Sequence, residues 1–105
     1  MLVAPSLIGY EIANTMHRKR SEGMSQEQVN HALQNLGRMD IELVYDEELH
    51  KESTTIARAL NHSAAYDAHY LAVSIRRGTR FITCDRRLSN SAAVIYNWVD
   101  FINPV

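Results

Sequence analysis

Short β-rich runs alternate with helical patterns along this chain, and that alternation constrains the fold more than any other feature. Strand-like runs lie near residues 2–4, 41–45, 80–84 and 95–99. Helical patterns fill residues 7–20, 26–37, 46–61 and 64–77, and a short helix or turn is expected over 88–93. Regular alternation of this kind is typical of α/β proteins, in which helices cover both faces of a parallel sheet.

Local start and stop signals support the expected helices. Ser6 is expected to cap the first helix, and Ser25 with Gln28 has the spacing of a capping box for the second. Gly37 and Gly78 stand where the second and fourth helical patterns stop, as glycine often does after a helix. Capping and stop residues therefore support the helix boundaries that the helical periodicity predicts.

Composition limits the class of protein. A chain of 105 residues is long enough for one domain, so we expect a single domain over residues 1–105. A hydrophobic content of 46% is normal for a globular core, and no run approaches the roughly 18 apolar residues of a membrane span. One cysteine excludes an intrachain disulfide, which favours a reducing, cytoplasmic location. A net charge of −1 gives no overall attraction for nucleic acid, so any basic surface must be local.

Basic residues gather in two places. One cluster is His17-Arg18-Lys19-Arg20, and the other flanks Asp85 and consists of Arg76, Arg77, Arg80, Arg86 and Arg87. Either these residues complement helix ends, or they form a basic rim around an acidic pocket, as binding to a phosphate backbone requires.

Three widely separated carboxylates are the candidate functional residues. Asp85 follows the strand-like run that begins at Phe81, Asp67 lies in the first turn of an apolar helix, and Glu11 lies on an apolar stripe with Ile8 and Ile12. Ligands of parallel α/β sheets bind beyond the carboxyl ends of the strands, which is where Asp85 is expected.

A shared divalent cation would explain such carboxylates. A carboxylate on a buried stripe is costly without a partner, and no lysine or arginine stands three or four residues after Glu11. Mg²⁺ prefers oxygen ligands and retains water, so a few acids suffice to hold it. The alternatives are that Asp85 caps the next helix, Asp67 complements a helix dipole and Glu11 is a surface acid.

Three segments of the chain resemble motifs of the PIN domain family, as found in the toxins of VapBC toxin–antitoxin modules. The segment from Ala4 to Asn14 is similar to the helix that bears an acidic glutamate in that family. Tyr66-Asp67-Ala68-His69-Tyr70-Leu71-Ala72 resembles its Tyr-Asp-Ala-x-Tyr-Leu-Ala helix. Thr83-Cys84-Asp85-Arg86-Arg87-Leu88 resembles its Thr-x-Asp-Arg-Arg-Leu segment. The middle motif is the most specific of the three.

The resemblance implies a three-layer α/β/α fold and an endoribonuclease that uses Mg²⁺ or Mn²⁺ to cleave RNA. Glu11, Asp67 and Asp85 match the acids of the family's catalytic metal site. Thr83, Arg86 and Arg87 match positions beside the site and are expected to contact the RNA substrate. An antitoxin protein is the partner that the resemblance suggests.

The chain departs from the family pattern at its start. The family opens with a strand that lies in the middle of the sheet and ends in a further catalytic aspartate, and no such segment precedes Leu2 here. With one acidic ligand missing, we expect weak RNA cleavage or none. The alternative is a degenerate, non-catalytic PIN fragment that serves as a binding or oligomerisation module. Without the central strand we also expect a homo-oligomer, with a dimer that exchanges elements as the favoured form.

Overall fold

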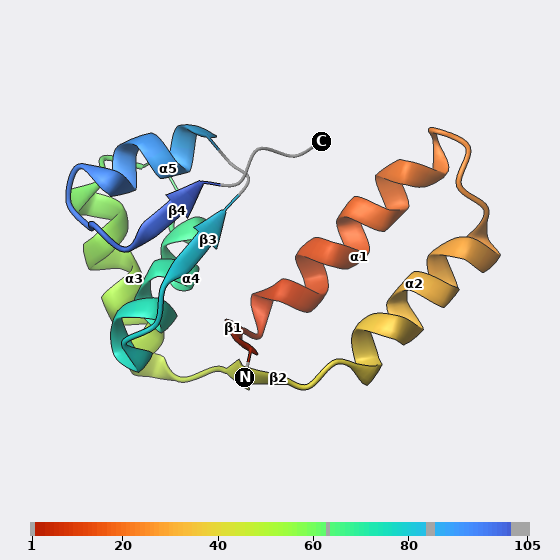
Figure 1. The fold of residues 1–105 in the computed structure, drawn as a ribbon, viewed down its shortest axis with the longest axis horizontal. Helices are drawn as coiled ribbons and strands as arrows, with labels where there is room; N and C mark the ends of the chain where they lie inside the picture. Colours follow the sequence, from red (N-terminus) through yellow and green to blue (C-terminus); the bar gives the residue numbers. More distant parts are fainter. Residues whose placement is uncertain (1, 63, 84–85, 102–105) are drawn as a thin grey trace. The chain divides into compact units, whose positions relative to one another are not determined.

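The computed structural model describes residues 2–62, 64–83 and 86–101, and these residues form an alternating sequence of strands and helices (Figure 1). The elements are β1 (Leu2–Pro5), α1 (Leu7–Arg20), α2 (Gln26–Arg38), β2 (Ile41–Val44), α3 (Glu47–Ala59), α4 (Tyr66–Arg77), β3 (Phe81–Thr83), α5 (Arg86–Ala93) and β4 (Val99–Phe101). They divide into two compact units, an N-terminal unit (Met1–Val44) and a C-terminal unit (Tyr45–Val105).

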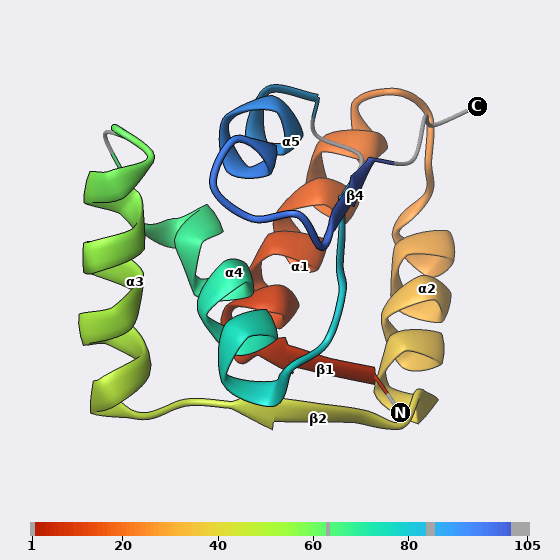
Figure 2. The same cartoon turned by 60° about the vertical axis from the view of Figure 1, so that its left-hand side comes forward.

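The N-terminal unit is a parallel strand pair joined by a helical hairpin. β1 and β2 pair from Leu2 opposite Ile41 to Pro5 opposite Val44. Parallel strands need a long crossover connection, and α1 and α2, which lie side by side in both views, supply it (Figures 1 and 2). Val29 of α2 is buried, whereas no residue of α1 is fully buried.

The helix ends of this unit follow the local signals only in part. The Ser25 hydroxyl accepts a hydrogen bond from the Gln28 amide at 3.1 Å, and the Gln28 side chain accepts one from the Ser25 amide at 2.8 Å, so the capping box is confirmed. Ser6 precedes α1 in a helical conformation and its side chain makes no capping bond, so that expectation is wrong. Gly37 does not end α2, because the helix continues to Arg38.

The C-terminal unit packs two helices beside a second parallel strand pair. α3 and α4 make the most extensive contact of this unit (Figure 2), and β3 pairs with β4 from Phe81 opposite Val99 to Thr83 opposite Phe101. α5 connects these two strands. The core of the C-terminal unit contains the buried apolar side chains Leu49, Ile56, Ala57, Leu60, Ala68, Leu71, Ala72, Val73, Leu88 and Ala92.

Polar contacts link α3 to the far end of α4. Asp46 caps α3 by accepting a hydrogen bond from the Leu49 amide at 2.7 Å. The Arg76 guanidinium donates to both oxygens of the same carboxylate, at 2.6 and 3.1 Å, and to Glu52 at 3.1 Å. The hydrogen bonds from Arg76 and from the Leu49 amide lower the pKa of Asp46 below its ordinary 3.8. Gly78 then ends α4 in the left-handed conformation, with φ of 63°.

The α/β class and the parallel pairing of the strands are confirmed, but two details differ from expectation. Instead of one sheet, the described strands form two separate two-stranded sheets, β1–β2 and β3–β4. The last strand begins at Val99 rather than near residue 95, because the amides of Ile95 and Tyr96 bond back to the Ala92 carbonyl at 3.0 and 2.8 Å and extend the turn after α5. In the described part of the chain, no helix is both long and apolar enough to cross a bilayer.

Candidate functional site

Asp67 lies in the first turn of α4, at the positive end of the helix dipole. Its side chain is half-buried, and the next residue, Ala68, is fully buried together with Leu71 one turn later. Among the residues that the structure describes, the Asp67 carboxylate has neither a hydrogen-bond nor an ion-pair partner. A half-buried carboxylate without a protein partner suits a cation ligand, because hard divalent cations prefer carboxylate oxygens.

β3 returns along α4 toward the end that carries Asp67. The short connection at residues 78–80 reverses the chain, so that β3 and α4 run in opposite directions (Figures 1 and 2). The rings of Tyr70 and Phe81 lie against each other, with centroids 6.3 Å apart. Asp67 precedes Tyr70 by almost one turn, and Thr83 follows Phe81 at the carboxyl end of β3. Both residues therefore lie beyond this ring contact in the same direction.

The segment after Thr83 contains most of the remaining predicted site residues. Asp85 lies outside the described residues, as do the side chains of Arg86 and Arg87, whose backbone opens α5. Thr83 is half-buried at the end of β3. β3 ends at Thr83 and α5 begins at Arg86, whereas the placement of Asp85 and the roles of these residues stay predictions.

Glu11 belongs to the other unit. It lies on α1, where it is exposed rather than buried on an apolar stripe, because Ile8 and Ile12 on the same helix are themselves only half-buried. The Thr15 hydroxyl donates to its backbone carbonyl at 3.0 Å. Since Glu11 and Asp67 lie in separate units, their convergence on one ion stays a prediction. The described residues contain no group of three or more histidine, cysteine or acidic side chains placed to hold a metal.

A pair of histidines near the start of α4 was not anticipated from the sequence. His50 Nδ1 of α3 lies 2.9 Å from His69 Nε2 of α4, and His69 Nδ1 lies 2.7 Å from the Ala65 carbonyl oxygen. Because a carbonyl only accepts, His69 Nδ1 carries a hydrogen, and one of the two facing nitrogens, His50 Nδ1 or His69 Nε2, carries the hydrogen of the contact between the rings. Tyr45 packs edge-on against His50, at 5.3 Å between ring centroids. The contact between His50 and His69 joins α3 to the end of α4 that carries Asp67.

The expected basic rim around Asp85 is partly neutralised. Arg76 is bound by Asp46 and Glu52, and Arg80 donates two hydrogen bonds of 2.6 Å to Asp100 of β4. The hydrogen bonds from Arg80 lower the pKa of Asp100. Arg76 and Arg80 therefore brace helices and strands, whereas the expected contact of Arg86 and Arg87 with phosphate stays a prediction.

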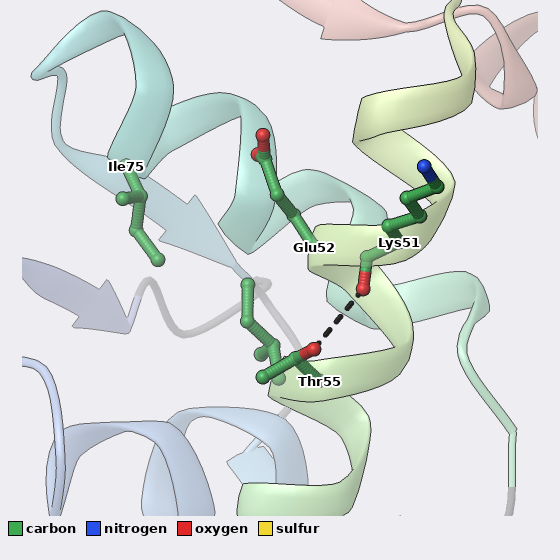
Figure 3. A pocket seen from close by; sticks show the side chains of 5 residues that line it. Lys51, Glu52, Thr55 and Ile75 are labelled. Carbon is green, nitrogen blue, oxygen red and sulfur yellow. Dashed lines mark hydrogen bonds between the residues drawn. The ribbon is translucent and has the colours of Figure 1, made fainter.

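An open pocket of about 370 Å³ lies between α3 and the carboxyl-terminal half of α4 (Figure 3). Lys51, Glu52, Thr55, Ile56 and Ile75 line it, and the Thr55 hydroxyl bonds to the Lys51 carbonyl at 3.2 Å. Ile75 is eight residues from Asp67, which corresponds to about 12 Å along a helix. The pocket is therefore separate from the candidate carboxylate.

Comparison with known proteins identifies the family. A family model described as PIN domain matches residues 1–94, which is most of the chain. No curated protein and no solved structure matches it. PIN domains are generally nucleases and typically use divalent metal ions. The match includes α1, α4 and the junction between β3 and α5, the elements that carry Glu11, Asp67 and Asp85. The chain therefore belongs to the PIN domain family.

Proposed function

We propose that this protein is a metal-dependent endoribonuclease related to the toxins of toxin–antitoxin modules. The observation that carries the proposal is the half-buried Asp67 carboxylate, which has no partner among the described residues and heads the helix that packs against β3. A cytoplasmic location and an antitoxin partner accompany this proposal.

The acids Glu11, Asp67 and Asp85 would hold Mg²⁺ or Mn²⁺ through carboxylate oxygens, the ligand type that these ions prefer. Such an ion, when bound, activates water and offsets negative charge that develops on phosphate. The Thr83 hydroxyl, at the end of β3, would help to orient a substrate oxygen.

Arg86 and Arg87 open α5 directly after the Asp85 junction. Guanidinium groups bind phosphate through paired hydrogen bonds, so these two residues would hold the RNA backbone on either side of the cleaved bond.

The second candidate function is a non-catalytic PIN module that binds a partner or oligomerises. One observation favours it: both edges of each two-stranded sheet are unpaired by any described strand. In this reading Asp67 is retained as a remnant of the ancestral site.

Two measurements on the purified chain separate the candidates. Mn²⁺ binding is followed by electron paramagnetic resonance, and cleavage of a fluorescent single-stranded RNA is followed with Mg²⁺, with Mn²⁺ and with EDTA. Asp67→Asn tests the site, and Asp40→Asn is the matched control because Asp40 is an exposed aspartate between α2 and β2.

We expect Mn²⁺ binding and metal-dependent RNA cleavage that Asp67→Asn removes and Asp40→Asn preserves. Equal Mn²⁺ binding by all three proteins would contradict the assignment of Asp67. Absence of both binding and cleavage would favour the non-catalytic module.

A further inference from the structure

His50 of α3 and His69 of α4 bring two imidazole nitrogens together across a helix interface. His50 Nδ1 lies 2.9 Å from His69 Nε2, and the ring centroids are 5.1 Å apart. Both residues belong to the C-terminal unit, in which α3 and α4 pack against each other. Each histidine directly follows a buried residue, Leu49 or Ala68, so the core fixes the backbone positions of both rings.

The hydrogen bonds of His69 are those of a metal ligand. Its Nδ1 donates to the Ala65 carbonyl at 2.7 Å, which leaves Nε2 as the nitrogen that faces His50. A histidine that binds a metal usually donates its other ring hydrogen to a carbonyl or a carboxylate, because this bond fixes the tautomer and the ring orientation. His50 is exposed and presents Nδ1 to the same point. Two neutral imidazoles that face one point are a donor set for a late transition-metal ion.

The spacing of the two rings matches the tetrahedral coordination of Zn²⁺. With Zn–N bonds of about 2.0–2.1 Å and a tetrahedral angle of about 109°, two imidazole nitrogens lie about 3.3–3.4 Å apart and their ring centroids about 5.2 Å apart. The observed centroids are 5.1 Å apart, and the nitrogens are closer, at 2.9 Å, because they share a hydrogen. A small change of ring orientation, with both helices in place, therefore admits the ion.

From this geometry we propose that His50 Nδ1 and His69 Nε2 bind one Zn²⁺ ion, which links α3 to the start of α4. The ion takes the place of the hydrogen between the rings. In the neutral pair this hydrogen passes through water to Nε2 of the exposed His50, so both ligands stay neutral. Water completes the tetrahedron, which makes binding reversible, unlike that of a structural site closed by four side chains.

The zinc site differs in chemistry from the proposed carboxylate site. Zn²⁺ binds imidazole well, whereas Mg²⁺ and Mn²⁺ prefer oxygen ligands. His69 follows Asp67 by two residues in the first turn of α4, so bound zinc also fixes the turn that carries this carboxylate. The inference does not rest on the proposed nuclease activity.

Zinc titration of the purified chain in excess Mg²⁺ tests the site, because Mg²⁺ occupies oxygen ligands and leaves imidazole free. Isothermal titration calorimetry compares the wild type with His50→Gln, with His69→Gln and with the control His31→Gln, since His31 is exposed on α2. We expect one tightly bound Zn²⁺ per chain in the wild type and in His31→Gln, and binding weaker by about tenfold or more in the other two variants. A wild type that binds no Zn²⁺, unchanged affinity in either His50→Gln or His69→Gln, or lost binding in His31→Gln would overturn the inference.

Two further readouts identify the ligating atoms and separate the zinc site from Asp67. In long-range ¹H–¹⁵N spectra of the histidine rings, Zn²⁺ should shift His50 Nδ1 and His69 Nε2 while His69 Nδ1 keeps its hydrogen; shifts confined to other histidines would exclude this pair. Asp67→Asn should lose Mn²⁺ binding and keep Zn²⁺ binding, and His50→Gln should do the reverse. Loss of Zn²⁺ binding in a folded Asp67→Asn variant would place the zinc at the carboxylate instead. A chain that binds Zn²⁺ at the histidines but no Mn²⁺ would contradict the proposed function alone.

Discussion

Leu71→Ala should destabilise the C-terminal unit more than any change to the exposed side of α4. Leu71 is 0% exposed and lies one turn after Asp67, in the core between α3, α4 and β3. Removal of its terminal carbons loses about 2.4 kcal/mol of transfer free energy, at about 0.8 kcal/mol per carbon. The cavity left behind brings the expected cost to roughly 3–4 kcal/mol, within the range of about 2–5 kcal/mol typical of such changes. That is a large part of a total stability of about 5–15 kcal/mol.

Ile75→Ala is the matched control because it removes the same number of carbons from the same helix. Ile75 is 42% exposed, so little more than half of the transfer term is lost and the surrounding side chains can relax into solvent. We expect a loss of about 1 kcal/mol. Helix propensity changes little and similarly in the two variants, since both introduce alanine.

Urea unfolding followed by tryptophan fluorescence measures the difference. Trp98 is the only tryptophan of the chain and lies in the C-terminal unit, so its emission reports on that unit. With a denaturant slope of about 1–2 kcal/mol per M, the midpoint of Leu71→Ala should lie roughly 1–3 M below that of Ile75→Ala. Unfolding free energies of the two variants that agree within about 0.5 kcal/mol would refute the burial argument for α4.

Two further predictions concern polar contacts of the same unit. Ser74→Ala should cost about 1–3 kcal/mol and shift the emission maximum of Trp98, because the indole N–H donates to the Ser74 hydroxyl at 2.8 Å and would lose its acceptor; an unchanged emission maximum would contradict this. Asp46→Asn keeps a capping side chain but removes the charge that binds Arg76. Because Arg76 lowers the pKa of Asp46, the wild-type advantage in melting temperature should be present near pH 7 and disappear as the pH falls below the ordinary 3.8. A pH-independent difference between pH 7 and pH 3 would argue against the charge contribution.

The sequence predicted the elements well wherever short-range chemistry decides them. The helix from Gln26 begins at a capping box whose two hydrogen bonds join residues three apart, and the helix before Gly78 ends at a left-handed glycine. The last strand was placed too early, because the turn that holds Tyr96 against the Ala92 carbonyl competes locally with an apolar β-rich run.

The candidate site was only partly accessible from the sequence. The Tyr-Asp-Ala-x-Tyr-Leu-Ala motif correctly indicated the family and placed Asp67 in the first turn of a helix. Glu11 seemed to lie on a buried stripe, yet it is exposed, because periodicity shows which residues share a helix face and not whether that face is covered.

The sequence by itself determined the α/β class, most helix boundaries and the family, since all three depend on patterns within short stretches of chain. Only the tertiary structure decided that His50 meets His69, that Arg76 meets Asp46, and that the strands pair as β1–β2 and β3–β4. His50 and His69 are 19 positions apart in the sequence, and Asp46 and Arg76 are 30 positions apart. Such contacts depend on how whole elements pack, because the free energy of burying apolar surface is non-directional and does not specify which distant partners meet.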